Sequence, residues 1–254
     1  MQLWTPEHAK TLLPALGVFL ILSVILRLLL KSKPLFVRMI PVQIIAVILV
    51  LLEIGKQAYS FAIGYDLYHI PLHFCSLCLF ALPLFAFYRG KYRQQVASIA
   101  VAFTAAVFIL TAIYPSLIYS AWDIQNYFKN FFAFHTATFH PLVMLALMLI
   151  VALDLYKPQK GDWKYPVIFI GAYCIVAGIV AHLLKTNYNN LYQCNIPPLE
   201  SLRLTVHGVF GYVPTQILYV LVVTCLDMAF TLGAYHLYRL CRRLVCGKDT
   251  QPES

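Results

Sequence analysis

Long apolar runs separated by short polar connections make up most of this chain. A helix that crosses a bilayer needs about 20 mainly apolar residues, and segments of that length recur about seven times. We therefore predict an all-α fold, a polytopic transmembrane helical bundle. The predicted spans are residues 11–30, 37–59, 70–88, 95–120, 135–156, 165–184 and 213–238.

The composition agrees with a chain that lies largely within a membrane. Of 254 residues, 61% are hydrophobic and 11% are charged, whereas about 25% are charged in an ordinary soluble domain. The longest predicted connection, residues 185–212, is shorter than an independently folded domain. We predict one integral membrane domain over residues 1–254, with a short tail from residue 240 and no cleavable signal peptide.

The basic residues indicate membrane topology. The formal net charge is +9, but the basic side chains fall in alternate connections and form no single patch, so no nucleic-acid partner is expected. Positive residues favour the cytoplasmic side of a membrane. The N-terminus is therefore expected outside and the C-terminus in the cytoplasm. One side receives 14 of the 19 basic residues: Arg27, Lys31, Lys33, Arg38, Arg89, Lys91, Arg93, Lys157, Lys160, Lys164, Arg239, Arg242, Arg243 and Lys248.

Ionisable residues inside the predicted spans are candidates for function, because a charge in hydrocarbon is costly and usually faces the bundle interior or a cavity. Glu53 and Lys56 are three residues apart in the second span, so they share a helix face and can pair. Asp227 lies on a polar stripe of the last span. Polar residues in a bundle also serve packing through hydrogen bonds, and both interpretations stay open.

The start of the third span combines His73 with two cysteines, Cys75 and Cys78. With 3.6 residues per turn, His73 points away from Cys75, so these side chains cannot surround one metal ion. A disulfide within this helix would be strained, and no metal site or cofactor is expected. Because Pro71 suits a first helical turn, Cys75 lies near exposed N–H groups that favour a thiolate. Cys75 is a reactive thiol or a small buried side chain.

Several reactive side chains share one depth in the predicted topology, in the outer half of the membrane. A histidine there can serve as the general base for a thiol on a neighbouring helix. His140 shares a helix face with Thr136 and is the candidate for that role. The group is Glu53, Lys56, His73, Cys75, His135, His140 and His182.

Short motifs in a fixed order resemble the YwaF-type bacterial membrane proteins over nearly the whole chain. They are an acidic second span, Pro71-Leu72-His73-Phe74-Cys75, His140-Pro141, Thr186-Asn187-Tyr188 and Pro197-Pro198-Leu199-Glu200-Ser201. Animal relatives of that family include a transmembrane acyltransferase that moves a polyunsaturated acyl chain from a phospholipid to a lyso-ether phosphatidylethanolamine, with a cysteine proposed as essential. The resemblance implies that Cys75 corresponds to that cysteine and His140 to its partner, in a bacterial plasma membrane.

The leading hypothesis is a thiol-dependent acyltransferase or hydrolase that acts on phospholipid acyl chains, with membrane lipids as its partners. Cys75 would be the nucleophile and His140 the base. Candidate donors to the developing oxyanion are Asn187 and Tyr188. The other supporting side chains are Glu53, Lys56, His73, His135 and His182.

Two other classes of function remain open. A small transporter or permease would use Glu53, Lys56 and Asp227 as a path for protons or solute and would need no reactive thiol. A non-catalytic membrane protein would use its polar stripes only to hold helices together.

Overall fold

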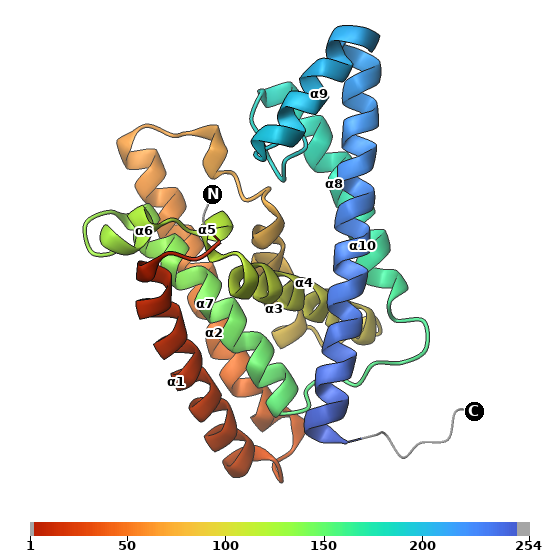
Figure 1. The fold of residues 1–254 in the computed structure, drawn as a ribbon. Helices are drawn as coiled ribbons and strands as arrows, with labels where there is room; N and C mark the ends of the chain where they lie inside the picture. Colours follow the sequence, from red (N-terminus) through yellow and green to blue (C-terminus); the bar gives the residue numbers. More distant parts are fainter. Residues whose placement is uncertain (1–2, 248–254) are drawn as a thin grey trace.

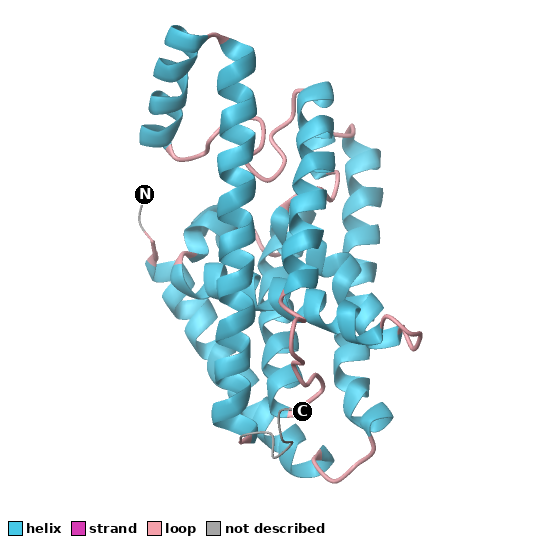
Figure 2. Ribbon diagram, turned by 90° about the vertical axis from the view of Figure 1, so that its right-hand side faces the viewer, coloured by secondary structure: helices cyan, strands magenta, loops and turns pink. Residues whose placement is uncertain are grey.

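The computed structural model describes residues 3–247, and every regular element in that range is helical (Figure 1 and Figure 2). The prediction of an all-α bundle is confirmed. The long helices are α1 (Pro6–Leu30), α2 (Leu35–Ile63), α4 (Arg93–Ile113), α7 (Phe131–Ala152), α8 (Lys164–Leu184) and α10 (Tyr212–Cys246). The shorter elements are η1 (Leu67–His69), η2 (Phe74–Ser76), α3 (Leu77–Phe87), α5 (Pro115–Ile118), α6 (Ala121–Gln125) and α9 (Pro197–Phe210).

Six of the described helices are long and apolar enough to cross a membrane: α1, α2, α4, α7, α8 and α10. The segment predicted as a third span at residues 70–88 forms a shorter apolar helix over Phe74–Phe87. At 1.5 Å per residue it is about 21 Å long, less than the hydrocarbon thickness of about 30 Å. The predicted start at residue 70 was wrong, because the preceding segment is irregular.

Other boundaries differ from the prediction as well, and three have a clear consequence or cause. α4 ends at Ile113, short of residue 120, because the residue before Pro115 is unfavourable in a helix. α7 begins at Phe131, where the side chain of Asn130 accepts from two backbone N–H groups of the first turn. α10 continues through residue 240 to Cys246, so the predicted tail begins as helix. Residues 248–254 of that tail lie outside the described range.

α4 is the central helix of the bundle. It packs against α3, α7, α8 and α10. More than half of its most apolar stretch is buried, whereas only about a tenth of the corresponding stretch is buried in α1 and in α10. Its buried face is rich in alanine, for example Ala97, Ala100, Ala102, Ala105 and Ala106. Small side chains let neighbouring helices approach closely. α1 and α10 therefore present most of their apolar surface to the surroundings.

Arginines from three helices bind the C-terminal end of α7. Arg27 of α1 donates to the Ala152 carbonyl at 2.6 Å, Arg38 of α2 donates to the Leu153 carbonyl at 2.7 Å, and Arg242 of α10 pairs with Asp154 at 2.7 Å. Cations are favourable at this end of a helix, where carbonyls lack helical partners. We call this end of the bundle the basic end, and the opposite end, which carries α5, α6 and α9, the pocket end.

The connection between α8 and α10 is held by a hydrogen-bonded chain that we call the Glu200 clamp. Glu200 accepts from Arg203 at 2.8 and 2.6 Å and from the backbone N–H of Cys194 at 2.9 Å. Arg203 also donates to Gln216 of α10 at 2.8 Å, and Gln216 donates to the Tyr192 carbonyl at 3.0 Å. Residues 185–196 are therefore tied to both α9 and α10.

We predict that Arg203→Met loosens residues 185–196. The Arg203 guanidinium holds the pKa of Glu200 below its usual range, so the stabilisation is complete above that usual range and is lost as the pH falls through the lowered pKa. Losing one partner of a charged hydrogen bond costs about 1–3 kcal/mol. Amide hydrogen exchange of this segment should rise in the variant at neutral pH, and in the wild type only in acid. Exchange unchanged relative to the exposed control Lys129→Met would contradict the clamp.

Candidate functional site

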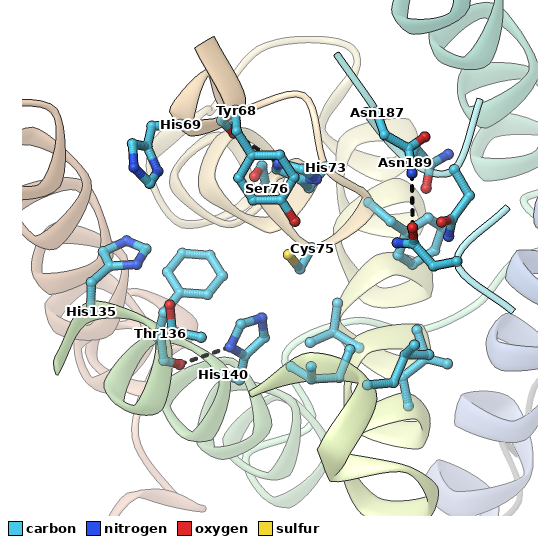
Figure 3. Close-up of a pocket in the computed structure, with 18 of the residues that line it drawn as sticks. Tyr68, His69, His73, Cys75, Ser76, His135, Thr136, His140, Asn187 and Asn189 are labelled. Atoms are coloured by element: carbon cyan, nitrogen blue, oxygen red, sulfur yellow. Dashed lines mark hydrogen bonds between the residues drawn. The ribbon is translucent and has the colours of Figure 1, made fainter. Parts of the chain in front are cut away.

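One pocket at the pocket end gathers ionisable side chains from several elements. Its volume is about 650 Å³, and it lies between α2, α7, α10, the segment 64–76 and the connection 185–196 (Figure 3). Its ionisable and amide side chains are Glu53, Lys56, His69, His73, Cys75, Asp123, His135, His140, Asn187, Asn189, Asn190, Asn195 and Asp227. We call it the Cys75 pocket. Six of the seven side chains expected at one depth line it, and only His182 does not.

The irregular segment 64–73 forms one wall of this pocket. α2 ends at Gly64, whose φ of 101° lies in a region that L side chains rarely adopt. Figure 1 shows the chain then running from the end of α2 back into the bundle to reach α3. Non-helical backbone within a membrane domain is tolerated where protein buries it or where it lines a polar cavity. The segment therefore interrupts the run of long helices next to the pocket.

Side chains satisfy three consecutive carbonyls of this segment. Tyr188 donates its hydroxyl to Leu67, His73 Nε2 donates to Tyr68 at 3.0 Å, and Gln57 donates to His69 at 2.7 Å. The Leu67 carbonyl also accepts from the backbone N–H of Ile70 at 3.1 Å. Three separate elements therefore hold this wall, and His73 keeps its Nδ1 lone pair because a carbonyl can only accept.

Cys75 lies in the first turn of the helix that η2 and α3 form together. His73 is the N-cap, with extended backbone and no side-chain cap. The N–H groups of a first helical turn have no acceptor within the helix itself. Unpaired N–H groups and the helix dipole favour negative charge at this point. Because this helix begins at Phe74 and not at residue 70, Cys75 lies nearer to its start than the sequence predicted.

His140 presents an unoccupied nitrogen to the same pocket. Its Nδ1 lies 2.8 Å from the Thr136 carbonyl, so Nδ1 carries the proton in that bond. Its Nε2 is buried and has no partner among the described residues. Figure 3 shows the ring between Thr136 and Cys75. The hydrogen bond to Thr136 leaves Nε2 as a proton acceptor directed into the cavity, as a general base requires.

A compact charged network lies beside these two residues. Glu53 is 2.8 Å from Lys56 and 3.2 Å from His135 Nε2, and it accepts from Gln57 at 2.7 Å. The Glu53 and Lys56 side chains are only 10% and 12% exposed. The ring of His69 stacks on Phe132 nearby. The pairing predicted from the spacing is thus observed, and His135 joins it from α7.

Three of the predicted site side chains make hydrogen bonds away from Cys75: Asn187, Tyr188 and His182. Asn187 accepts from the backbone N–H of Tyr192 and donates to Asn195, which organises the connection that it belongs to. Tyr188 is fully buried and its hydroxyl is bonded to Leu67. His182 Nδ1 donates to a carbonyl of its own helix, outside the Cys75 pocket. Asn187 does line the pocket, whereas the other two do not.

Sequence reasoning missed Asn189 as part of the site. It adopts a left-handed backbone with φ 50° and donates to Asp227 at 2.7 Å, while the Cys174 thiol lies 3.5 Å from the same carboxylate. The run Thr186-Asn187-Tyr188-Asn189-Asn190 contained the signal, because asparagine tolerates this conformation better than most residues. Asp227 therefore reaches the Cys75 pocket from α10.

No group of three or more potential metal ligands converges in the part of the chain that the structure describes. The reactive groups that line the Cys75 pocket include a thiol, imidazoles, carboxylates, amides and one ammonium group.

Comparison with known proteins gives one result. The sequence model of the TMEM164 family matches residues 3–233. No curated protein and no solved structure shows significant similarity to the chain.

We predict that Glu53→Gln harms the protein more than Lys56→Met, and that the double variant is milder than Glu53→Gln. Glu53→Gln leaves a buried ammonium without its carboxylate, whereas Lys56→Met leaves Glu53 with Gln57 and His135. Breaking a buried pair by removing one member costs about 3–5 kcal/mol. Thermal unfolding in detergent measures the order of the three. Equal midpoints would mean that the two charges do not depend on each other.

Proposed function

The chain belongs to the TMEM164 family of membrane proteins, and from that membership and the Cys75 pocket we propose that it transfers or hydrolyses lipid acyl chains through a thiol. One observation carries the proposal. The free Nε2 of His140 and the thiol of Cys75 face one cavity, and Cys75 lies in the first turn of its helix. Nucleophile, base and oxyanion donors are the three parts of acyl-transfer chemistry.

The first half of the reaction forms a thioester. His140 Nε2 takes the thiol proton while the sulfur attacks the carbonyl carbon of a lipid ester. The N–H groups of Phe74 and Cys75 stabilise the negative oxygen of the tetrahedral intermediate. The carbon–oxygen bond then breaks, and the lyso-lipid leaves with the proton that Nε2 had taken. These backbone donors take the role expected for Asn187 and Tyr188, whose polar groups are engaged elsewhere.

The second half of the reaction restores the thiol. Nε2 accepts the proton of an incoming hydroxyl, from a lyso-lipid or from water, and that oxygen attacks the thioester. The carbon–sulfur bond breaks, and the sulfur recovers the proton from His140. A lyso-lipid acceptor gives acyl transfer, whereas water gives hydrolysis, so the exclusion of water decides between them.

The remaining walls of the pocket suit an amphiphilic substrate. The apolar side chains of the lining include Phe74, Val107, Leu110, Phe139, Leu226 and Phe230. An acyl chain is expected along these side chains, with its ester near Cys75 and its polar headgroup towards Lys56 and Asp227. Membrane lipids are the amphiphiles available to such a pocket. From the resemblance to YwaF-type proteins, we also propose that the protein lies in a bacterial plasma membrane.

A transporter is the second candidate, supported by a specific observation. Glu53, Lys56 and Asp227 line one cavity although they come from α2 and α10. Charged groups that share a cavity within a membrane domain are typical of ion or solute paths. Isolation of an acylated Cys75 would favour the enzyme, whereas proton uptake that depends on Asp227 and survives Cys75→Ser would favour the transporter.

We predict that a lipid-like electrophile labels Cys75 in preference to Cys78. Cys75 lines the pocket, whereas Cys78 is fully buried in the apolar core. Access alone could explain that difference, so the role of the base is tested separately. His140→Ala should lower the labelling rate about 100- to 10,000-fold, while the matched variant His182→Ala, outside the pocket, should leave it unchanged. Mass spectrometry of the modified peptide measures both rates.

The same chemistry predicts that Cys75→Ser folds normally and fails to remodel lipids. Lipid profiles of membranes with the wild type and with Cys75→Ser should differ in acyl-chain distribution. Identical profiles, or equal labelling in His140→Ala and His182→Ala, would remove the thiol mechanism and leave the transporter.

We also propose about seven passes, counting Phe74–Phe87 as the third, with the pocket end outside. Reporter fusions after Lys129 and after Lys248 should then lie on opposite sides, with Lys129 outside, and a fusion at Lys91 should agree with Lys248. The basis is the distribution of the basic residues between alternate connections. Fusions at Lys129 and Lys248 on the same side would disprove this topology.

A further inference from the structure

A second cavity lies between α1, α6 and α7, and we call it the α1–α7 groove. Its volume is about 540 Å³, within the range of about 300–1,000 Å³ that is usual for small-molecule sites. α1 contributes residues four apart, Thr11, Ala15 and Phe19, which lie on one helical face. Thr11 is exposed, so the groove is open to the surroundings of the bundle.

The polarity of the groove changes along its length. Gln125 and the exposed Lys129 line it at the α6 end. Ala15, Phe19 and Leu142 line it further towards the middle of α1 and α7, two helices that are apolar enough to span a membrane. A molecule that matches this surface has an anionic or strongly polar head and an apolar tail.

The groove and the Cys75 pocket share a thin wall. Thr136 and His140 of α7 line the pocket, whereas Ala137 and Pro141, each the next residue along, line the groove. Tyr119 lines the groove, and its ring stacks with His140 at a centroid distance of 6.3 Å and an angle of 20°. The groove is thus separate from the cavity that holds Cys75, although it contacts the same histidine from behind.

We propose that the α1–α7 groove binds one glycerophospholipid of the surrounding leaflet, with an acyl chain along α1 and α7 and its phosphate at Lys129. Charge complementarity favours this occupant, because the negative charge of a phosphate complements the positive charge of Lys129. Depth favours it as well, since the apolar part of the groove runs along membrane-spanning helices, where lipid chains are the surrounding solvent. This site does not depend on the thiol reaction, and it remains if that reaction is disproved.

Photo-labelling in nanodiscs tests the groove directly. The probe is phosphatidylcholine with a diazirine in its acyl chain, and mass spectrometry locates the label. Phe19 and Leu142 should be labelled above Val18, which is exposed on the outer face of α1. Equal labelling of groove and outer positions would overturn the proposal, as would a cross-link between two copies of the chain through this face.

Variants that fill the groove provide the matched comparison. Ala15→Phe and Ala137→Phe should each reduce labelling of Leu142 to the level of Val18, whereas Ala62→Phe, at an exposed position of α2 outside both cavities, should not. Lys129→Glu should also reduce labelling without filling the groove, which keeps the test decisive if a filled variant does not fold. Unchanged labelling in a folded Ala15→Phe or Ala137→Phe variant, or in Lys129→Glu, would show that no lipid is held there.

Discussion

The site depends on one constraint, which is that side chains hold the short connection between α2 and α3 in place through the carbonyls of residues 67–69. Leu67, Tyr68 and His69 present three successive carbonyls, and the partners come from Tyr188, His73 and Gln57. Those partners belong to the connection after α8, to the segment itself and to α2. Once they are in place, the start of the next helix is fixed, and with it the position of Cys75.

The same constraint links the parts of the site that would otherwise be independent. Gln57 bonds to the His69 carbonyl and to Glu53 at the same time, so the charged network on α2 and the irregular wall share one amide. Tyr188 belongs to the connection that the Glu200 clamp holds against α9 and α10. Asn189, on that connection, orients Asp227. The loops that border the cavity are thereby held against the helices that form its other walls.

Much of the bundle follows from apolar run lengths, because a membrane leaves few alternatives to helices. The pairing of Glu53 with Lys56 followed from a three-residue spacing, and the shared cavity of Cys75 and His140 agrees with the depth expected from topology. The irregular wall did not follow, since Gly64 and Pro71 mark an interruption without stating where the chain goes next. The role of Tyr188 depends on a partner 121 residues away, which no local pattern reveals. Asn189 was missed although its local asparagine-rich run favours the left-handed backbone that it adopts. The extension of α10 beyond residue 240 was missed because the arginines there suggested a polar tail.

The arginines at the basic end have a consequence for how the protein assembles. Arg27 and Arg38, counted as a topological signal, also donate to the last carbonyls of α7, and Arg242 of the final helix pairs with Asp154 beside them. During synthesis, α1 and α2 emerge before α7, so Arg27 and Arg38 are already present when its end enters the membrane. Asp154 must wait for α10. Closure of the bundle at this end therefore comes last, because Asp154 gains its arginine only when α10 is in place.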